Sequence, residues 1–397
     1  MTNQPNAIPD DWNHHAHQLW LNNDVNGAIE TVLKDINVRA QKPKPVMMQF
    51  GYYLFLLNDY PSAVTLFENI LVDHPNDPEV MTNLVVSLSR SGNDKKAIAY
   101  AIEQLRIDNK NFSLWDSLAT SFERAGQPEK AISAGKNSLL IKDKQFGKPD
   151  PQWVLPQTSP QELVANKKQV IAFSLWGNQP RYIFGSLRNL LLAPDLYPGW
   201  ELWFYVDRTV PQKVINMLRQ LGATVMMQAP DQPEKQKLCW RFEVANRSDV
   251  GYFLVRDADS VFSLRERLAV DEWMASDQYF HIIRDWWSHT DLILAGLWGG
   301  VAGVLPNIKA DVAHYCPNTV HTPNIDQWYL RDCLWKHIKQ SCLVHDRFAR
   351  TPDALPIPGP KPEGNIHIGS CEYHQAKDQQ IQLLSPWLEK LWPRMSS

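Results

Sequence analysis

Two carboxylates follow a strongly apolar segment in the second half of the chain. Residues 251–260 are GYFLVRDADS, so Asp257 and Asp259 lie two positions apart directly after a predicted strand. Because side chains alternate faces along an extended chain, both carboxylates can point the same way at the strand's end. Carboxylate oxygens suit Mg²⁺ or Mn²⁺, and such a cation can hold a diphosphate. The pattern therefore predicts a cation and diphosphate site, and a solvated turn after a core strand is the alternative.

The elements that would position these carboxylates are strands alternating with helices from residue 168 onward. Predicted strands cover 169–175, 201–206, 223–228, 252–256 and 279–283, with a later one ending at 344–346 and helical stretches at 182–192 and 211–221. Such alternation is typical of a mostly parallel, Rossmann-like sheet that binds ligands at the carboxyl ends of its strands. In the glycine-rich segment 294–300, Gly299 would let a ligand approach the backbone closely, and a simple turn would use it equally well.

The first strand-to-helix loop is a second candidate for ligand contacts. The strand ends in FSLWGN, and Tyr182 opens the next helix. In a nucleotide-binding sheet this loop is where a base and ribose would lie. Ser174, Trp176, Asn178 and Tyr182 are therefore predicted nucleotide contacts.

The N-terminal part carries an internal repeat. Ala63, Ala97 and Ala131 are 34 residues apart, as are Gly92 and Gly126. Each unit predicts two helices, the first with an apolar stripe at i, i+3, i+4 and i+7. Residues 44–145 resemble tetratricopeptide repeats in period and small residues, with a degenerate unit from near residue 12. Such a solenoid could hold a peptide or a second subunit, or serve only as a spacer or dimer contact.

These patterns predict an α + α/β chain with three parts. We expect a tetratricopeptide-like helical solenoid at 1–146, a proline-rich linker at 147–167 and an α/β domain at 168–397. The formal net charge of −3 gives no electrostatic case for a nucleic-acid partner or an anionic membrane. No apolar run approaches the roughly 20 residues of a membrane span. Five scattered cysteines without a CxxC pair predict free thiols and a cytoplasmic location.

Taken in order, the motifs of residues 168–375 resemble the metal-dependent glycosyltransferases of the GT-A fold, closest to the family 8 pattern and a bacterial group related to it. The matching strings include FSLWG, WRF, RDADS, HIIRD and VHDRF. The resemblance implies that Arg241 and Asp285 contact a nucleotide-sugar donor. It further implies that Asp326, followed by Gln327, acts at the reacting centre, and that a late histidine, His345 or His367, completes a metal shell with Asp257 and Asp259.

Each implied role has a structural alternative in the residues themselves. Arg241 could form an ion pair, Asp285 could pair with Arg284 or cap a helix, and Asp326 could be an N-cap. The sequence also departs from the family pattern at Leu294 and Trp328, where an asparagine and an acid are expected. These departures leave the donor sugar and the stereochemical outcome open.

The predicted function is transfer of a sugar from a UDP- or GDP-sugar, assisted by Mn²⁺ or Mg²⁺, to a peptide, protein or glycan acceptor recruited by the repeats. One alternative is a repeat scaffold that carries a weak or inactive transferase domain. Another is a different metal-diphosphate enzyme such as a nucleotidyltransferase. That class usually has a glycine-rich basic loop after its first strand, where this chain has Trp176-Gly177-Asn178.

Overall fold

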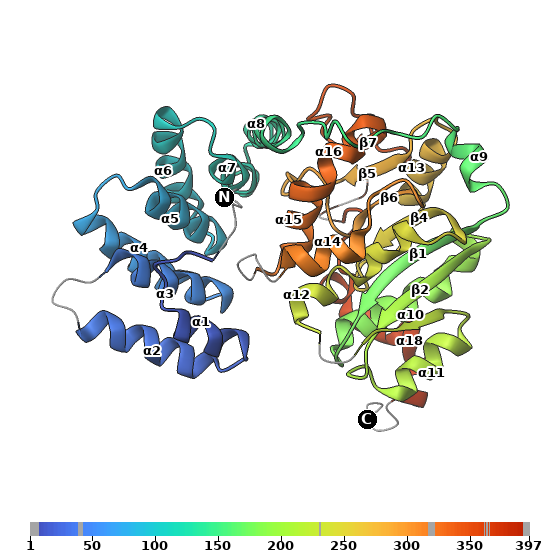
Figure 1. Ribbon diagram of the computed structural model, residues 1–397, viewed down its shortest axis with the longest axis horizontal. Coiled ribbons are helices and arrows are strands. Elements are labelled where there is room, and N and C mark those ends of the chain that lie inside the picture. Colours follow the sequence, from blue (N-terminus) through green and yellow to red (C-terminus); the bar gives the residue numbers. More distant parts are fainter. Residues whose placement is uncertain are drawn as a thin grey trace. The chain divides into compact units, whose positions relative to one another are not determined.

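The computed structural model describes residues 8–38, 43–229, 232–316, 322–360, 362, 364 and 366–391 (Figure 1). The chain divides into two compact units, one of residues 1–142 with 318–323 and the other of residues 143–317 with 324–397. The division therefore falls after Lys142, where the sequence pattern placed it after Phe146.

The first unit is built from paired helices. Their bounds are α1 (His14–Leu21), α2 (Val25–Val38), α3 (Lys44–Leu56), α4 (Tyr60–Asp73), α5 (Pro78–Arg90), α6 (Asp94–Ile107), α7 (Phe112–Arg124) and α8 (Pro128–Phe146). Consecutive helices from α1 to α7 pack against one another, and α5 also packs against α7. This is the stacking expected of helical repeats.

The 34-residue period is visible in both the turns and the core. Asn58, Gly92 and Gly126 have φ values of 60°, 79° and 70°, so the same left-handed turn recurs in each unit. Ala63 and Ala97 are at most 1% exposed, because a small residue is needed where helices cross closely. The tetratricopeptide-like repeat is confirmed at this level.

Residues 147–167 form an irregular segment with one short helix, α9 (Pro160–Val164). The segment packs on the second unit through side-chain hydrogen bonds. The indole N–H of Trp153 donates to the Val304 carbonyl at 3.3 Å, and the Gln161 amide donates to that of Ser276 at 2.8 Å. The proline-rich stretch is thus an ordered strap on the α/β unit.

The second unit is organised around one mixed seven-stranded sheet (Figure 1). The strands are β1 (Lys168–Leu175), β2 (Trp200–Val206), β3 (Thr224–Met227), β4 (Val250–Arg256), β5 (Phe280–Arg284), β6 (Leu297–Val301) and β7 (Cys342–Asp346). Their order is β3-β2-β1-β4-β6-β5-β7. The first four strands are parallel, β6 is antiparallel to both of its neighbours, and β5 and β7 are parallel.

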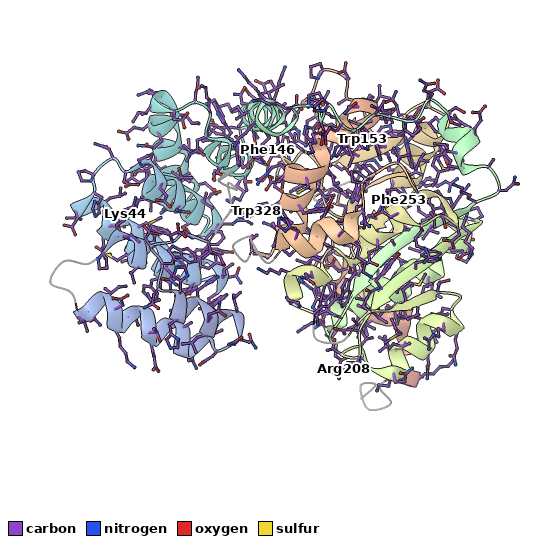
Figure 2. All side chains as sticks on the ribbon, in the orientation of Figure 1. Lys44, Phe146, Trp153, Arg208, Phe253 and Trp328 are labelled. Atoms are coloured by element: carbon purple, nitrogen blue, oxygen red, sulfur yellow. The ribbon has the colours of Figure 1, made fainter. Side chains whose placement is uncertain are left out.

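The sequence predicted a ligand loop or a turn at residues 294–300, but residues 297–301 form strand β6. Gly299 and Gly300 lie inside it because it is held closely between its neighbours. A Cβ on Gly299 would lie 2.5 Å from the Phe253 carbonyl oxygen, and one on Gly300 would lie 2.6 Å from the Phe280 ring. Phe253, labelled in Figure 2, belongs to β4, all of which is buried. The glycines therefore serve strand packing.

Helices and short turns cover this sheet. They are α10 (Pro180–Leu196), α11 (Gln212–Gln220), α12 (Glu234–Lys237), α13 (Leu264–Met274), α14 (Ile308–Tyr315), α15 (Ile325–Tyr329), α16 (Trp335–Ile338), α17 (Glu372–Gln375) and α18 (Lys377–Leu391), with the 3₁₀ helices η1 (Trp240–Asn246) and η4 (Lys339–Ser341) and the π-helical turn η3 (Leu330–Leu334). Because α12 ends at Lys237 and η1 begins at Trp240, residues 237–246 do not form one continuous helix. All five cysteines are free thiols. Among the described helices, none is long and apolar enough to cross a membrane.

Candidate functional site

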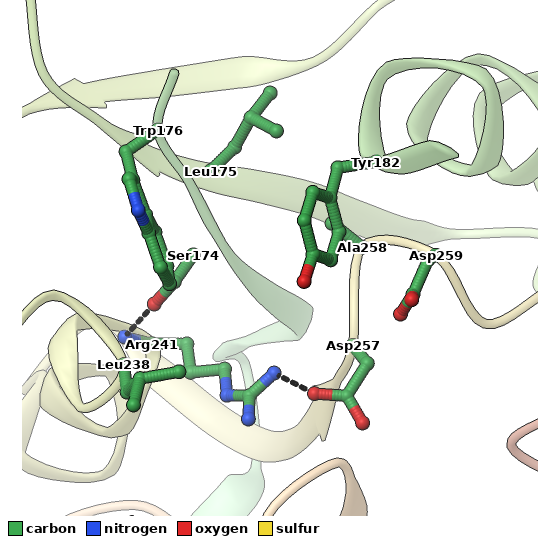
Figure 3. A pocket seen from close by; sticks show the side chains of 9 residues that line it. All are labelled: Ser174, Leu175, Trp176, Tyr182, Leu238, Arg241, Asp257, Ala258 and Asp259. Carbon is green, nitrogen blue, oxygen red and sulfur yellow. Dashed lines mark hydrogen bonds and ion pairs between the residues drawn. The ribbon is translucent and has the colours of Figure 1, made fainter. Parts of the chain in front are cut away.

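A cavity of about 230 Å³ lies at the carboxyl ends of β1 and β4 (Figure 3). Because these strands are neighbours and parallel, their carboxyl ends reach the same edge of the sheet. The lining residues come from the end of β1, the start of α10, the α12–η1 segment and the loop after β4. They are Ser174, Leu175, Trp176, Tyr182, Leu238, Arg241, Asp257, Ala258 and Asp259. Six of the predicted site residues are therefore brought together.

Two glycines, Gly185 and Gly296, pack directly against residues 257–259, the acidic loop that follows β4. A Cβ on Gly185 of α10 would lie 2.2 Å from the Ala258 carbonyl oxygen, so the helix can approach the loop only without a side chain. A Cβ on Gly296 would lie 2.0 Å from Oδ2 of Asp257. The position of the Asp257 carboxylate therefore requires a glycine at 296. Neither Gly185 nor Gly296 has a positive φ, so close packing and not backbone conformation accounts for both.

Arg241 is the centre of a buried charge cluster. Its backbone N–H donates to Oγ of Ser174 at 3.1 Å, which ties η1 to the end of β1. The guanidinium Nη1 donates to the carbonyl of Arg256 at 3.0 Å and to Oδ1 of Asp257, and Nη2 donates to Oδ2 of Asp326 at 3.0 Å. Arg241 is 4% exposed and links the buried carboxylate of Asp326 to that of Asp257, whose side chain is 45% exposed.

Asp259 faces a second arginine. Nε of Arg181 lies 3.8 Å from Oδ2 of Asp259, and the Arg181 guanidinium also donates to the Tyr182 hydroxyl. Burial raises the pKa of Asp259, and the nearby charge of Asp257 raises it further. An added cation would offset the repulsion between these two carboxylates. Arg181 directly precedes Tyr182, which is the sequence signal that could have identified it.

Asp326 does not line the cavity, but it contacts Arg241, which does. It is 5% exposed, lies at the second position of α15 and accepts from the N–H of Gln327 at 2.9 Å. The N-cap position of this helix is Asn324, so the cap interpretation of Asp326 is wrong. Burial raises its pKa to about 6, with Arg241 opposing that shift.

Three other predicted contacts lie outside the cavity lining. Asn178 is exposed on the β1–α10 loop. Asp285 is fully buried and accepts from Arg265 at 2.7 Å and from the N–H of Ile368 at 2.8 Å. Its partner is thus Arg265, and the expected pairing with Arg284 is not the one formed. Gly299 lies within β6 as described above.

The two late histidines also occupy other surroundings. His345 is fully buried, with Nδ1 2.9 Å from Nε2 of His281 and Nε2 2.9 Å from Oε2 of Glu272. His367 stacks on Trp286 at 4.8 Å between ring centroids, and its Nδ1 lies 2.9 Å from the Ile368 carbonyl. Neither ring lines the cavity that holds Asp257 and Asp259.

A polar cluster beside the first loop was missed by the sequence analysis. Asp207, 2% exposed, follows β2 and accepts from Nζ of Lys237 at 2.7 Å and from the N–H of Thr209 at 2.9 Å. The Thr209 hydroxyl in turn accepts from the N–H of Gly177 at 2.7 Å. An acid directly after an apolar strand was the available signal. The cluster fixes the loop that carries Trp176.

The two carboxylates of the cavity are the residues that could hold a cation. In the part of the chain that the structure describes, no group of three or more histidine, cysteine, aspartate or glutamate side chains could hold a metal ion. Magnesium, however, is commonly bound by one or two carboxylates together with phosphate oxygens and water. Asp257 and Asp259 could hold such a cation when a diphosphate completes its shell.

Comparisons with known proteins locate the repeats. Residues 32–128 match the family model of the coatomer epsilon subunit, a tetratricopeptide-like helical family. No curated protein sequence matches the chain. Among solved structures, a mutant O-GlcNAc transferase of Thermobaculum terrenum is 16% identical, with a TM-score of 0.39, over 61% of this chain and 44% of that one. The chain thus covers less than half of that protein's length.

Two structures of MamA are similar to about a third of the chain. The RS-1 ArsTM double mutant is 20% identical over 32% of this chain and 71% of that chain, with a TM-score of 0.30. The MSR-1 C2 structure is 20% identical over 33% and 75%, with a TM-score of 0.30. With TM-scores below 0.5, none of these likenesses carries an argument about function.

The resemblance to family 8 glycosyltransferases of the GT-A fold is wrong. The family model that matches is a helical-repeat family, and the described residues contain no three-ligand metal group of the kind that the resemblance implied. The roles that the resemblance gave to Arg241, Asp285, Asp326, Gln327 and the late histidines lose that support. Any role for them must come from the geometry alone.

Proposed function

We propose that the protein is a helical-repeat scaffold whose α/β domain binds a nucleoside diphosphate sugar together with Mg²⁺ or Mn²⁺ and has weak transferase activity. The observation that supports this proposal most strongly is the cavity at the carboxyl ends of β1 and β4. It combines two carboxylates, a buried arginine and the aromatic rings of Trp176 and Tyr182 at the sheet edge where α/β folds bind ligands. The repeats would recruit a protein partner to this domain.

Each part of the ligand has matching chemistry. Asp257 and Asp259 suit a divalent cation, Arg241 suits a phosphate, and the Trp176 ring, half-buried, suits a base or sugar face. The cavity volume of about 230 Å³ is below the roughly 300–1,000 Å³ of sites that enclose a drug-sized ligand. Only part of a nucleotide-sugar would therefore be enclosed.

Two features support weak rather than efficient catalysis. Oδ1 of Asp257 accepts from Arg241, and Asp326, the other carboxylate that Arg241 contacts, is buried and does not line the cavity. Efficient transfer needs a general base within hydrogen-bond reach of the acceptor. Among the described residues that line the cavity, Asp257 and Asp259, the proposed cation ligands, are the only carboxylates.

An active glycosyltransferase is the second candidate. It is favoured by Asp326, because burial raises the pKa of this carboxyl to about 6, in the range that suits acid–base chemistry near neutral pH. In that case closure around a bound donor would have to bring Asp326 to the reacting atoms.

The test is a thermal-shift series with UDP and GDP, each with Mn²⁺, with Mg²⁺ or with EDTA. We expect the melting temperature to rise only when nucleotide and cation are both present, because ligands stabilise the native state by mass action. Asp257→Asn and Asp259→Asn should abolish the rise. Asp271→Asn, a change of the same kind in the exposed Arg267–Asp271 pair of α13, is the control and should respond as the wild type does.

An unchanged response of the Asp257→Asn and Asp259→Asn variants would show that the site is elsewhere. A panel of UDP- and GDP-sugars followed for donor hydrolysis then separates the two candidates. Hydrolysis that is faster than the rate without enzyme but does not reach multiple turnovers supports the scaffold with weak activity. Multiple-turnover hydrolysis or transfer supports the active enzyme.

A further inference from the structure

The contacts of Arg241 affect how a cation and a diphosphate bind in the cavity, and this inference rests on the proposed function. A cation at Asp257 and the Arg241 guanidinium would share one carboxylate. Arg241 already donates to Oδ1 of Asp257. Because the guanidinium is 4% exposed and the Asp257 side chain is 45% exposed, water can screen the repulsion between the two positive charges only from the side of the carboxylate. Without an anion, the cation must therefore bind against a neighbouring positive charge.

A diphosphate changes this balance. Its oxygens accept strong, charge-assisted hydrogen bonds from arginine and also ligate the cation. The guanidinium has a donor to offer, because Nε of Arg241 is buried and has no hydrogen-bond partner among the described residues. Asp326 lies on the other side, with Oδ2 3.0 Å from Nη2, and keeps the arginine anchored while Nη1 is released from Asp257.

We propose that Arg241 makes cation and diphosphate binding mutually dependent, because it occupies Asp257 until a phosphate takes over its Nη1 donor. Asp326 is the positioning residue that retains Arg241 near the cavity during this exchange. Since coupling between two ligands is reciprocal, the diphosphate strengthens cation binding by the same factor by which the cation strengthens diphosphate binding.

The chain offers a matched control for this inference. Arg181 is the other arginine beside the carboxylates, with Nε 3.8 Å from Oδ2 of Asp259, and its side chain is 39% exposed. Replacing either arginine by methionine removes one positive charge and keeps an apolar stem. Only the Arg241 change frees Asp257, so the two variants separate a specific contact from a general change in charge.

The experiment is a titration of Mn²⁺ followed by electron paramagnetic resonance, with and without saturating UDP. For the wild type we expect UDP to tighten Mn²⁺ binding by about 10- to 100-fold, within the usual range of coupling between sites. In Arg241→Met, Mn²⁺ alone should bind at least about tenfold more tightly than in the wild type and UDP should bind more weakly. The coupling should fall about tenfold below that of the wild type, and what remains comes from the direct bonds between diphosphate and cation. Arg181→Met should retain the wild-type coupling.

Arg241→Met leaves Asp326 buried without its partner and could fail to fold. The double variant Arg241→Met/Asp326→Asn removes both charges of that pair and should give the same Mn²⁺ result. If UDP changes wild-type Mn²⁺ affinity by less than threefold while both ligands bind, the inference is wrong and the proposed function stands. If the wild type binds neither Mn²⁺ with UDP nor UDP with Mn²⁺, the proposed function itself is wrong.

Discussion

Arg256 and Glu266 form a fully buried ion pair, with Nε 2.6 Å from Oε1 and side-chain exposures of 2% and 3%. Arg256 is the last residue of β4 and Glu266 lies in the first turn of α13. The Tyr197 hydroxyl also donates to Oε1 of Glu266 at 3.1 Å, and Nη1 of Arg256 donates to the Trp298 carbonyl at 2.9 Å. The pair therefore fixes the strand end from which the acidic loop starts.

Removing one partner of this pair should be strongly destabilising. Glu266→Gln leaves the Arg256 charge buried, and we expect the free energy of unfolding to fall by about 3 kcal/mol. Asp271→Asn on the same helix is the control, because the Arg267–Asp271 pair is exposed and should contribute at most about 0.5 kcal/mol. Urea denaturation of both variants measures the difference. Equal losses would contradict the distinction between the two acids.

This helix illustrates where the sequence was informative. The segment SLRE has the spacing of a capping box, and Ser263 is the N-cap of α13, with its Oγ accepting from the N–H of Glu266 at 3.2 Å. The charged residues of this segment are typical of a solvent-exposed helix surface, and Asp271 is exposed, but Glu266 is only 2% exposed. Local spacing specifies a cap, but it does not specify that an arginine from another strand will end beside the acid.

Adding a single methyl group at Gly185 or Gly296 tests how closely these glycines must pack against the acidic loop. In Gly296→Ala the new Cβ would displace the Asp257 carboxylate, and in Gly185→Ala it would displace the Ala258 backbone. Neither glycine has a positive φ, so the backbone itself tolerates alanine. We expect UDP–Mn²⁺ binding to weaken at least about tenfold in each, the equivalent of about 1.4 kcal/mol. Isothermal titration calorimetry measures the affinity.

Gly27→Ala provides the control for this test. A Cβ at Gly27 would also meet a carboxylate, 2.3 Å from Oδ2 of Asp24, but in the repeat unit. The variant should bind UDP–Mn²⁺ as the wild type does. A similar loss in Gly27→Ala and Gly296→Ala would mean that the effect comes from general destabilisation.

The strands and the repeats could be predicted because their signals are local. The apolar segment before Asp257, the FSLWG strand end and the 34-residue period each lie within one or two elements. The partners of Asp285 and His345 could not be predicted from the sequence. Arg265 contacts Asp285, and Glu272 contacts His345, because α13 packs beside β5 and β7 in the folded chain. Strand β6 was missed because two adjacent glycines usually mark a turn, and here neighbouring strands require them.

Acid should destabilise the α/β unit through His281. This residue is fully buried, and burial, with a smaller contribution from His345, lowers its pKa well below the ordinary value. The unfolded chain takes up a proton near pH 6.5 and the folded chain does not. The stabilising contribution is therefore complete above that pH and is lost as the pH falls, by up to about 1.4 kcal/mol per pH unit.

The measurement is the free energy of unfolding between pH 7 and pH 5. In His281→Gln the fall should be shallower than in the wild type, because the amide does not titrate. His15→Gln replaces an exposed histidine and should reproduce the wild-type slope. Opposing contributions from other groups are common to all three proteins and cancel in the comparison. Identical slopes for all three would remove His281 from the acid response.

The last prediction concerns Asp326, which separates the two candidate functions. As the anchor of Arg241, Asp326 should matter for stability, so Asp326→Asn should cost about 1.5–3 kcal/mol, the usual value of a hydrogen bond to a charged group. The pKa of about 6 lies above the ordinary value for aspartate, so folding favours the protonated form. The stability of the wild type relative to the Asn variant should therefore rise as the pH falls from about 6 toward 4. If Asp326 is only an anchor, donor hydrolysis in the variant stays within about threefold of the wild type. A loss of about 100-fold, with the disappearance of a rate increase near pH 6, would instead place Asp326 at the reacting atoms and favour the active transferase.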